Sequence, residues 1–517
     1  MRRRVFKLIL GFGFMLAAFF QVPVIAAEKE GPPNILFIMS DDHTTQAIGA
    51  YGDRLASRNP TPNIDALANN GMRFDRVFCH NSICTPSRAS IITGQYSQKN
   101  GVLDLNGNIP PERQFLPIEM KKAGYQTAMI GKWHLKKEPA AFDYYCVLPG
   151  QGEYYDPVFR IRGDKAWPNN MIRKNGQHSS DAITDISLNW LKNKRNKQQP
   201  FFLMHHFKAP HDMFENAERY DSYLEDVMIP EPVNLHNQPA EGFGSKATRG
   251  FGAGVTKNHP CWDLGGKLGI DKTLDEPEYG KAVYQKYLKR YLRCVKGIDD
   301  NVKRLIDYLK ETGELENTVI IYTGDQGFFL GEHDFIDKRW MYEEAFRMPF
   351  IVHAPGLVKA KSVNDWLINN TDFAPTILEL AGVESAPDYM QGKSFASALR
   401  GESKPDDWRR YTYYRYWMHL AHNLQVPAHF GIRSERYKLI FFYGCTTKGK
   451  KQTPVAWEFY DLEKDPDEMY NQYASPEYAS VIANMKLELK KVRSDLEETD
   501  VKYPRIKAII DADWHRK

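Results

Sequence analysis

The chain has 517 residues, of which 42% are hydrophobic and 13% aromatic, and its 69 Lys and Arg nearly balance its 65 Asp and Glu. This composition excludes a largely disordered protein, and the length allows one large domain with a second, smaller one. The near balance of charge excludes broad binding to nucleic acids, because such binding depends on a strong basic surplus.

Residues 1–27 are predicted to be a signal peptide. Three arginines and a lysine precede an apolar run over residues 8–20, and Ala26-Ala27 offers a small-residue cleavage site. A membrane anchor is the alternative, but Gly11 and Gly13 interrupt a run that is already short for a membrane span. We therefore expect an exported protein, periplasmic or secreted, with no stable membrane anchor.

Continuous apolar runs predict strands that are buried on both faces. These runs cover residues 34–39, 125–130, 201–207, 318–322 and 350–352. Segments with helical periodicity alternate with them, over residues 86–93, 115–123, 181–194, 279–311 and 372–381. This alternation predicts an α/β fold for a catalytic domain over residues 28–393, with a large, mostly parallel sheet between two layers of helices.

Polar side chains follow four of these predicted strands. They are Asp41-Asp42, Lys132 with His134, His211, and Asp325-Gln326. In such sheets, ligands bind beyond the carboxyl ends of the strands, so we expect these groups to share a site. The irregular, glycine-rich residues 212–277 are predicted to be a mobile insertion over it.

The pattern changes in residues 394–517, which are predicted to form a C-terminal subdomain. Short apolar runs joined by turns predict strands over residues 411–417, 430–433, 438–443 and 457–461, and residues 478–496 have the pattern of an amphipathic helix. We expect a small antiparallel sheet with one helix packed on it.

Cys84 is followed at fixed offsets by Pro86 and Arg88, and then by an apolar helix start. Proline suits the first turn of a helix, so Cys84 should lie at a helix N-terminus, where partial positive charge favours an anion. Arg88 lies one turn further along and points back to the same place. The alternative is a buried structural cysteine, paired with Cys79 or not.

The pentad Cys84-Thr85-Pro86-Ser87-Arg88 resembles the signature of type I sulfatases, which depend on formylglycine. The stretches 331–340 and 460–466 also resemble motifs of that family, so the resemblance covers most of the chain. It implies a fold of the alkaline-phosphatase and sulfatase type, and an enzyme that hydrolyses sulfate esters. It also implies that a maturing enzyme oxidises Cys84 to formylglycine, an aldehyde.

The oxygen donors of Asp41, Asp42, Asp325 and Gln326 suit a hard cation, Ca²⁺ or Mg²⁺. Three carboxylates in one pocket would repel each other without a metal. The resemblance implies calcium at these positions, with residue 84 in its oxidised form as a further ligand. Many family members carry Asn or His at the position of Gln326, so this chain departs from the family pattern there. The alternative to a metal ligand is that Gln326 is a simple turn residue.

The cations Arg88, Lys132 and Lys338 suit a bound sulfate, although a lysine taken alone is more often a solvated surface charge. His134 and His211 can exchange protons near neutral pH. By resemblance, His134 assists the step that re-forms the aldehyde, with Lys132 and Arg88 stabilising its hydrate. His211 and Lys338 would serve the leaving group.

Residues 413–429 are rich in aromatic residues and histidines, and include His419, His422 and His429. Rings stack on sugar faces and His bonds hydroxyls, so these histidines are candidates for a substrate-binding wall. A packed edge strand with its loop is an equal alternative.

The resemblance is greatest to family members that act on sulfated polysaccharides. The expected substrate is therefore a sulfated carbohydrate, either algal, such as ulvan or carrageenan, or a glycosaminoglycan. Two alternatives stay open. One is a phosphoesterase of the alkaline-phosphatase superfamily, with Thr85 as nucleophile and two zinc ions. The other is a sugar-binding protein in which Cys84 remains a thiol.

Overall fold

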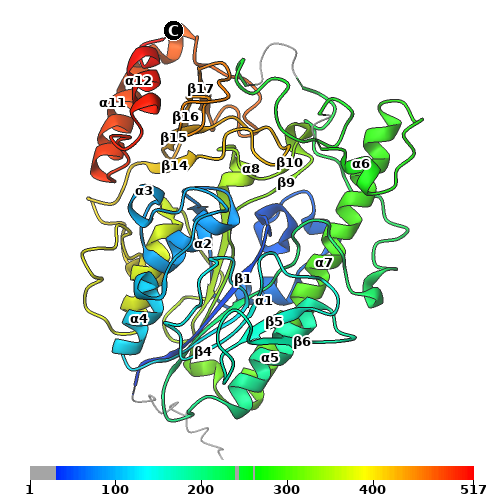
Figure 1. Cartoon of the computed structure of the whole chain (residues 1–517), viewed down its shortest axis with the longest axis vertical. Coiled ribbons are helices and arrows are strands. Elements are labelled where there is room, and N and C mark those ends of the chain that lie inside the picture. The colour runs from blue at the N-terminus through cyan, green and yellow to red at the C-terminus, as the bar shows by residue number, and fades with distance from the viewer. Residues whose placement is uncertain (1–30, 239–243, 260–261, 517) are drawn as a thin grey trace, which may run out of the picture. The chain divides into compact units, whose positions relative to one another are not determined.

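An 11-stranded sheet organises the molecule, with the strand order β12-β2-β11-β8-β1-β7-β3-β4-β5-β6 and β13 paired to β2. Figure 1 labels its strands β1, β4, β5 and β6. This computed structural model describes residues 31–238, 244–259 and 262–516, and the predicted signal peptide lies outside them. The strands are β1 (Asn34–Ser40), β2 (Met72–Phe78), β3 (Gln126–Lys132), β4 (Tyr144–Leu148), β5 (Val158–Ile161), β6 (Met171–Arg173), β7 (Phe201–His206), β8 (Thr318–Gly324), β11 (Arg347–His353), β12 (Ser362–Asn364) and β13 (Ile368–Asn369).

The centre of the sheet is parallel, as predicted, from β8 through β1, β7 and β3 to β4. The flanks are not uniformly parallel, because β11 runs antiparallel to both β8 and β2, and β5 and β6 add further antiparallel pairs. The sheet is therefore mixed. Because β8, β1, β7 and β3 point the same way, their carboxyl ends lie along one edge.

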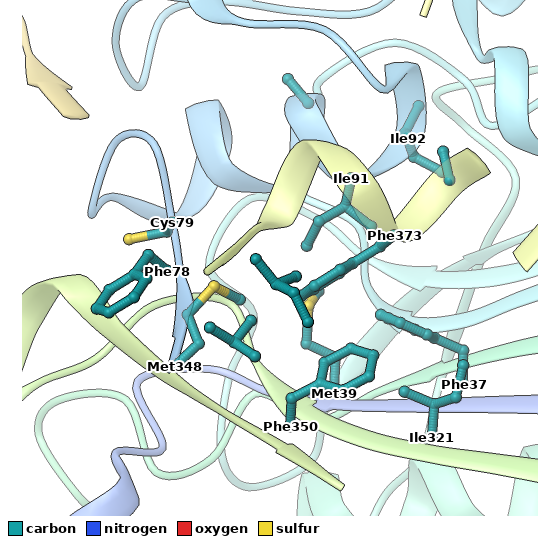
Figure 2. Packing of buried hydrophobic residues seen from close by; sticks show 14 of the residues in the cluster. Phe37, Met39, Phe78, Cys79, Ile91, Ile92, Ile321, Met348, Phe350 and Phe373 are labelled. Atoms are coloured by element: carbon teal, nitrogen blue, oxygen red, sulfur yellow. The ribbon is translucent and has the colours of Figure 1, made fainter. Parts of the chain in front are cut away.

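Helices cover both faces of this sheet, as the sequence predicts. Along β1, Phe37 and Met39 belong to a core cluster with residues of α2 (Cys84–Thr93), α4 (Phe115–Lys122) and α9 (Phe373–Leu380). Figure 2 shows part of this packing around Phe37, Ile91 and Phe373. The alternate residues Leu36 and Ile38 pack with α1 (Pro62–Asn69), α5 (Ser179–Asn193) and α7 (Glu278–Glu311). A strand buried on both faces needs a continuous apolar run, which explains why β1 is recognisable in the sequence.

Strand β2 was not predicted, and its composition gives the reason. Its sequence MRFDRVF carries charged side chains at Arg73, Asp75 and Arg76, which are all partly exposed. The strand lies near one side of the sheet, between β12 and β11. It therefore lacks the uninterrupted apolar run of a central strand.

The C-terminal region forms a separate four-stranded antiparallel sheet, shown in orange in Figure 1. Its strands are β14 (Thr412–Tyr416), β15 (His429–Arg433), β16 (Tyr437–Phe442) and β17 (Ala456–Asp461). Two helices pack on it, the predicted α11 (Ala479–Asp495) and the unpredicted α12 (Pro504–Asp513). Contacts join everything from Pro32 onward into one compact unit, and the boundary at residues 393 and 394 stays a prediction.

The remaining short elements include a small hairpin of β9 (Phe329–Leu330) and β10 (Ile336–Asp337). The short helices are α3 (Ser97–Asn100), α6 (Leu264–Lys267), α8 (Glu343–Phe346) and α10 (Ala396–Leu399). Within the described residues, no helix is both long and apolar enough to cross a bilayer.

Candidate functional site

Three carboxylates meet at the carboxyl ends of the two central strands β1 and β8. Ser40 at the end of β1 lies opposite Gly324 at the end of β8, so Asp41-Asp42 and Asp325 emerge side by side. The backbone N–H of Asp42 donates to Asp325 Oδ1 at 3.1 Å. One oxygen from each of the three carboxylates lies within 4.8 Å of the others, and all three residues are fully buried.

Three buried cations face these three carboxylates. Arg88 on α2 places Nε 3.0 Å and Nη2 2.9 Å from Asp325 Oδ2. Lys132 at the end of β3 forms an ion pair with Asp41, and Lys338, directly after β10, places Nζ 2.6 Å from Asp42 Oδ2. The formal charges of the six groups therefore cancel, which allows all of them to be buried together.

The oxygen atoms of this cluster fit a hard metal ion. Gln326 donates through Nε2 to Asp42 Oδ1. Its Oε1 is buried and, within the described part of the chain, accepts no hydrogen bond, and the same is true of Asp41 Oδ1. Buried oxygen acceptors without donors are rare in proteins unless a water or an ion satisfies them. The predicted ligands Asp41, Asp42, Asp325 and Gln326 thus converge, and their donor set suits Ca²⁺ or Mg²⁺.

The carboxylates respond differently to burial. Burial raises the pKa of Asp42 to about 7, although Lys338 opposes this shift. Burial would also raise the pKa of Asp325, but the nearby charges of Arg88 and Lys132 hold it below its ordinary value. The cations therefore keep one carboxylate of the cluster firmly ionised.

Cys84 is the first residue of α2 and lines a cavity of about 230 Å³. Its Sγ lies within 4.8 Å of one carboxylate oxygen of Asp41 and one ring nitrogen of His211. Cys84 is a free thiol, as is Cys79, whose Sγ lies 3.5 Å from the carbonyl oxygen of Phe346. Burial raises the pKa of Cys84 to about 12, so the unmodified side chain is a protonated thiol at neutral pH.

Both predicted acid–base histidines lie at the same edge of the sheet. His211 places Nδ1 2.7 Å from Asp212 Oδ1 and Nε2 3.8 Å from Asp42 Oδ2. Burial lowers its pKa to about 4, although Asp212 opposes the shift. His134 follows β3, and burial together with the charge of Lys132 holds its pKa far below the ordinary value. Its buried Nδ1 accepts no hydrogen bond from any described residue.

The structure also places residues on the cavity wall that the sequence analysis missed. Asp337 and Arg339 flank Lys338 and both line the cavity. Arg339 donates from Nε to Asp337 Oδ2 at 2.7 Å and from Nη1 to the hydroxyl of Tyr416 at 3.1 Å. Both residues have positive φ, +76° and +85°, which turns consecutive side chains toward one cavity. Three consecutive charged residues in the stretch that contains Lys338 were the available signal.

The three histidines proposed for a substrate wall have different positions. His422 lines the cavity together with Cys84. His419 turns its Nε2 to the carbonyl of Lys451 instead. His429 is fully buried, with its ring stacked on Trp340 and Tyr414. Of the three, His422 alone lines this cavity and stays a candidate for substrate binding, whereas the packed-strand alternative describes His429 on β15.

Comparison with known proteins identifies related sequences. The sequence matches the family Sulfatase over residues 33–383, and the family N-sulphoglucosamine sulphohydrolase, C-terminal, over residues 331–495. It is 40% identical to an N-acetylglucosamine-6-O-sulfatase of Bacteroides thetaiotaomicron, over 92% of this chain and 88% of that protein. It is 29% identical to the human N-acetylglucosamine-6-sulfatase, over 72% of this chain and 65% of the human protein.

Solved structures give the same relationship. One solved structure is a protein in complex with its substrate D-glucosamine-2-N,6-O-disulfate. It has a TM-score of 0.81 and 37% identity to this chain, and the match covers 91% of this chain and 99% of that protein. A phosphonate monoester hydrolase of Silicibacter pomeroyi has a TM-score of 0.67 and 22% identity, over 89% of this chain and 95% of that one, and shares the fold.

Proposed function

Because this chain belongs to the sulfatase family and is a sulfuric ester hydrolase, we propose that it removes the 6-O-sulfate of a glucosamine or N-acetylglucosamine residue in a glycosaminoglycan-type saccharide. The proposal draws on the relatives with 40% and 37% identity, one named an N-acetylglucosamine-6-O-sulfatase and the other bound to a glucosamine disulfate. Of the expected substrates, the proposal therefore selects the glycosaminoglycan class over the algal polysaccharides.

The observation that carries the proposal is the position of Cys84. It lies on a cavity wall, next to a buried cluster of carboxylates and among cations that suit sulfate oxygens. The cavity has a volume of about 230 Å³, whereas pockets for drug-sized ligands have roughly 300–1,000 Å³. A cavity of this smaller size suits one sulfated sugar residue.

The nucleophile of this proposal is Cys84 after oxidation to formylglycine. A buried thiol with a raised pKa is mostly protonated, and a thiol that attacked sulfur would remain sulfated and block further turnover. The proposal therefore includes a sulfatase-maturing enzyme as a partner, and export of the chain to the periplasm or the cell exterior.

Asp41, Asp42, Asp325 and Gln326 would hold the metal ion, and calcium fits this set better than magnesium. Calcium accepts irregular sets of oxygen ligands, whereas magnesium demands near-ideal octahedral geometry and keeps several waters. Bound there, calcium would polarise oxygen atoms of residue 84 and of the sulfate. The two acceptors without donors, on Asp41 and Gln326, are the observation that supports this ion.

The charged side chains have separate tasks in this proposal. Arg88 and Lys132 bind sulfate oxygens on the side of α2 and β3. Lys338 stays protonated, because the attraction of Asp42 and Asp337 raises its pKa despite burial. Together with His211, it stabilises the sugar oxygen that leaves. His134 is uncharged and offers Nδ1 to accept a proton from residue 84 when sulfate is released.

Two measurements test the proposal. Mass spectrometry of the tryptic peptide over residues 77–88 should show the aldehyde in place of the thiol in active protein. The enzyme should release sulfate from N-acetylglucosamine-6-sulfate faster than from galactose-6-sulfate or ulvan fragments. An active protein in which Cys84 is entirely a thiol would contradict the nucleophile. Faster zinc-dependent turnover of a phosphate ester would favour the phosphoesterase alternative.

A further inference from the structure

A second cavity adjoins the Cys84 cavity at Trp262. This neighbour has a volume of about 270 Å³ and is formed by residues 254–257, 259, 262–265, 272 and 279. Trp262 lines both cavities, and Lys267 lines the one that contains Cys84. Both residues come from the glycine-rich insertion, whose described part thus reaches the predicted site.

A short helical turn holds Trp262 and Lys267 together. Asp263 caps α6 by accepting from the N–H of Gly266 at 2.7 Å, and Leu264 is buried against the core beside α7. Lys267 Nζ lies 4.2 Å from the centre of the Trp262 ring, which is a cation–π contact. A structured turn therefore positions the half-buried ring where the two cavities adjoin.

Lys267 differs from the other charged groups of the Cys84 cavity. Asp212 contacts His211, Arg339 contacts Asp337, and Lys338 contacts Asp42. Lys267 is exposed, and within the described residues its ammonium has no acidic partner and no hydrogen-bond acceptor, only the face of Trp262. An ammonium held in this way is available to an anion that enters the cavity mouth.

We propose that Trp262 and Lys267 form a second sugar subsite, in which Trp262 stacks against the residue next to the sulfated sugar and Lys267 contacts a carboxylate on that residue. The first cavity is small, at about 230 Å³, so a longer substrate must extend beyond it, and the second cavity adjoins it at Trp262. This inference rests on the proposed function, because it presupposes the sulfated glucosamine in the first cavity.

The test compares the kcat/KM values of three substrates. They are 6-O-sulfated N-acetylglucosamine, the same sugar linked to a uronic acid, and that disaccharide with its carboxylate reduced to an alcohol. The parent enzyme should prefer the acidic disaccharide. In Lys267→Gln, the ratio of acidic to reduced disaccharide should fall about three- to fivefold, as expected for an exposed ion pair. In Trp262→Ala, both disaccharides should lose about tenfold relative to the monosaccharide, and Trp262→Phe should recover part of this loss.

Lys246→Gln is the matched control, since Lys246 is an exposed lysine of the same insertion that lines neither cavity. The inference is overturned if all three substrates are turned over and Lys267→Gln leaves their ratios as in the parent, or if Lys246→Gln changes the ratios equally. If the parent turns over none of them, the proposed substrate class fails, and this inference fails with it. A parent enzyme that turns over the reduced disaccharide as fast as the acidic one would also overturn the assignment.

Discussion

Arg88 and Asp325 are 237 residues apart in the sequence, yet Nε and Nη2 of the arginine lie 3.0 and 2.9 Å from one carboxylate oxygen of Asp325. The arginine comes from the helix that begins at Cys84, and the aspartate follows strand β8. This ion pair therefore links the helix of the proposed nucleophile to the proposed metal site. A change in either partner should affect both structure and catalysis.

Replacing Asp325 by Asn should abolish turnover and destabilise the fold by roughly 3–5 kcal/mol, because it leaves the buried Arg88 without its partner. Chemical denaturation would measure the stability, and metal analysis the calcium content. The exposed ion pair of Lys507 and Asp511, with 49% and 62% side-chain exposure, provides a control. Asp511→Asn should change stability by less than about 1 kcal/mol. Equal effects of the two substitutions would contradict the role of the buried pair.

Replacing Cys84 by Ala should lower turnover by at least about a thousandfold, because loss of the nucleophile removes the covalent route. Sulfate release from a 6-O-sulfated sugar measures it. Cys79→Ala is the matched control, since Cys79 is an equally buried free thiol that does not line the cavity. Turnover near the parent rate in Cys84→Ala would refute the mechanism.

Removal of the proposed calcium ion should silence the enzyme and lower its melting temperature. A ligand at 100 times its Kd contributes about 2.7 kcal/mol to stability. Calorimetry with and without a chelator tests this, and elemental analysis must show that the ion has left. Added Ca²⁺ should restore activity better than Mg²⁺. Full activity in protein shown to be free of metal would rule out the proposed role of the ion.

Acid should destabilise the protein partly through buried neutral histidines such as His205. This side chain is fully buried, its Nδ1 lies 2.8 Å from Ser187 Oγ, and burial lowers its pKa to about 3. Between this value and the unfolded pKa of about 6.5, the unfolded chain binds one more proton, so stability falls as pH falls. The contribution of one such group reaches about 1.4 kcal/mol per pH unit.

The measurement is the free energy of unfolding at several pH values between 7 and 4. His205→Asn should show a shallower dependence on pH than the parent, even if it is less stable overall. The exposed His515 serves as the control, and His515→Asn should keep the parental slope. An unchanged slope in His205→Asn would show that His205 does not contribute.

Lys438 should matter for stability and not for chemistry. It is fully buried on β16, with Nζ 3.0 Å from Glu343 Oε1 and 2.7 Å from Glu468 Oε1. Lys438→Met would leave the buried carboxylate of Glu468 without its cation, although Glu343 keeps Arg433 at 3.2 Å, and should cost roughly 3–5 kcal/mol. Turnover per folded molecule should stay near the parent value. Lys404→Met, at an exposed pair with Glu435, should have little effect on stability.

Much of the site could be predicted because its residues follow strands with a local signature. Asp41-Asp42 and Asp325 come directly after continuous apolar runs, and Lys132 ends another. Asp337 and Arg339 could not be predicted in this way. Asp337 ends the two-residue strand β10 and Arg339 lies in the loop after it, where backbone conformation and not periodicity directs the side chains.

The sequence by itself determined the central strands, because burial on both faces of a parallel strand requires an unbroken apolar run. It also determined the helix start at Cys84 and the set of oxygen and cationic groups, because these residues lie in short local motifs or follow such runs. Only the tertiary structure decided which neighbouring side chains face the cavity. His422 reaches it and His429 does not, because His429 is packed against Trp340, a residue 89 positions away whose contact no local pattern encodes.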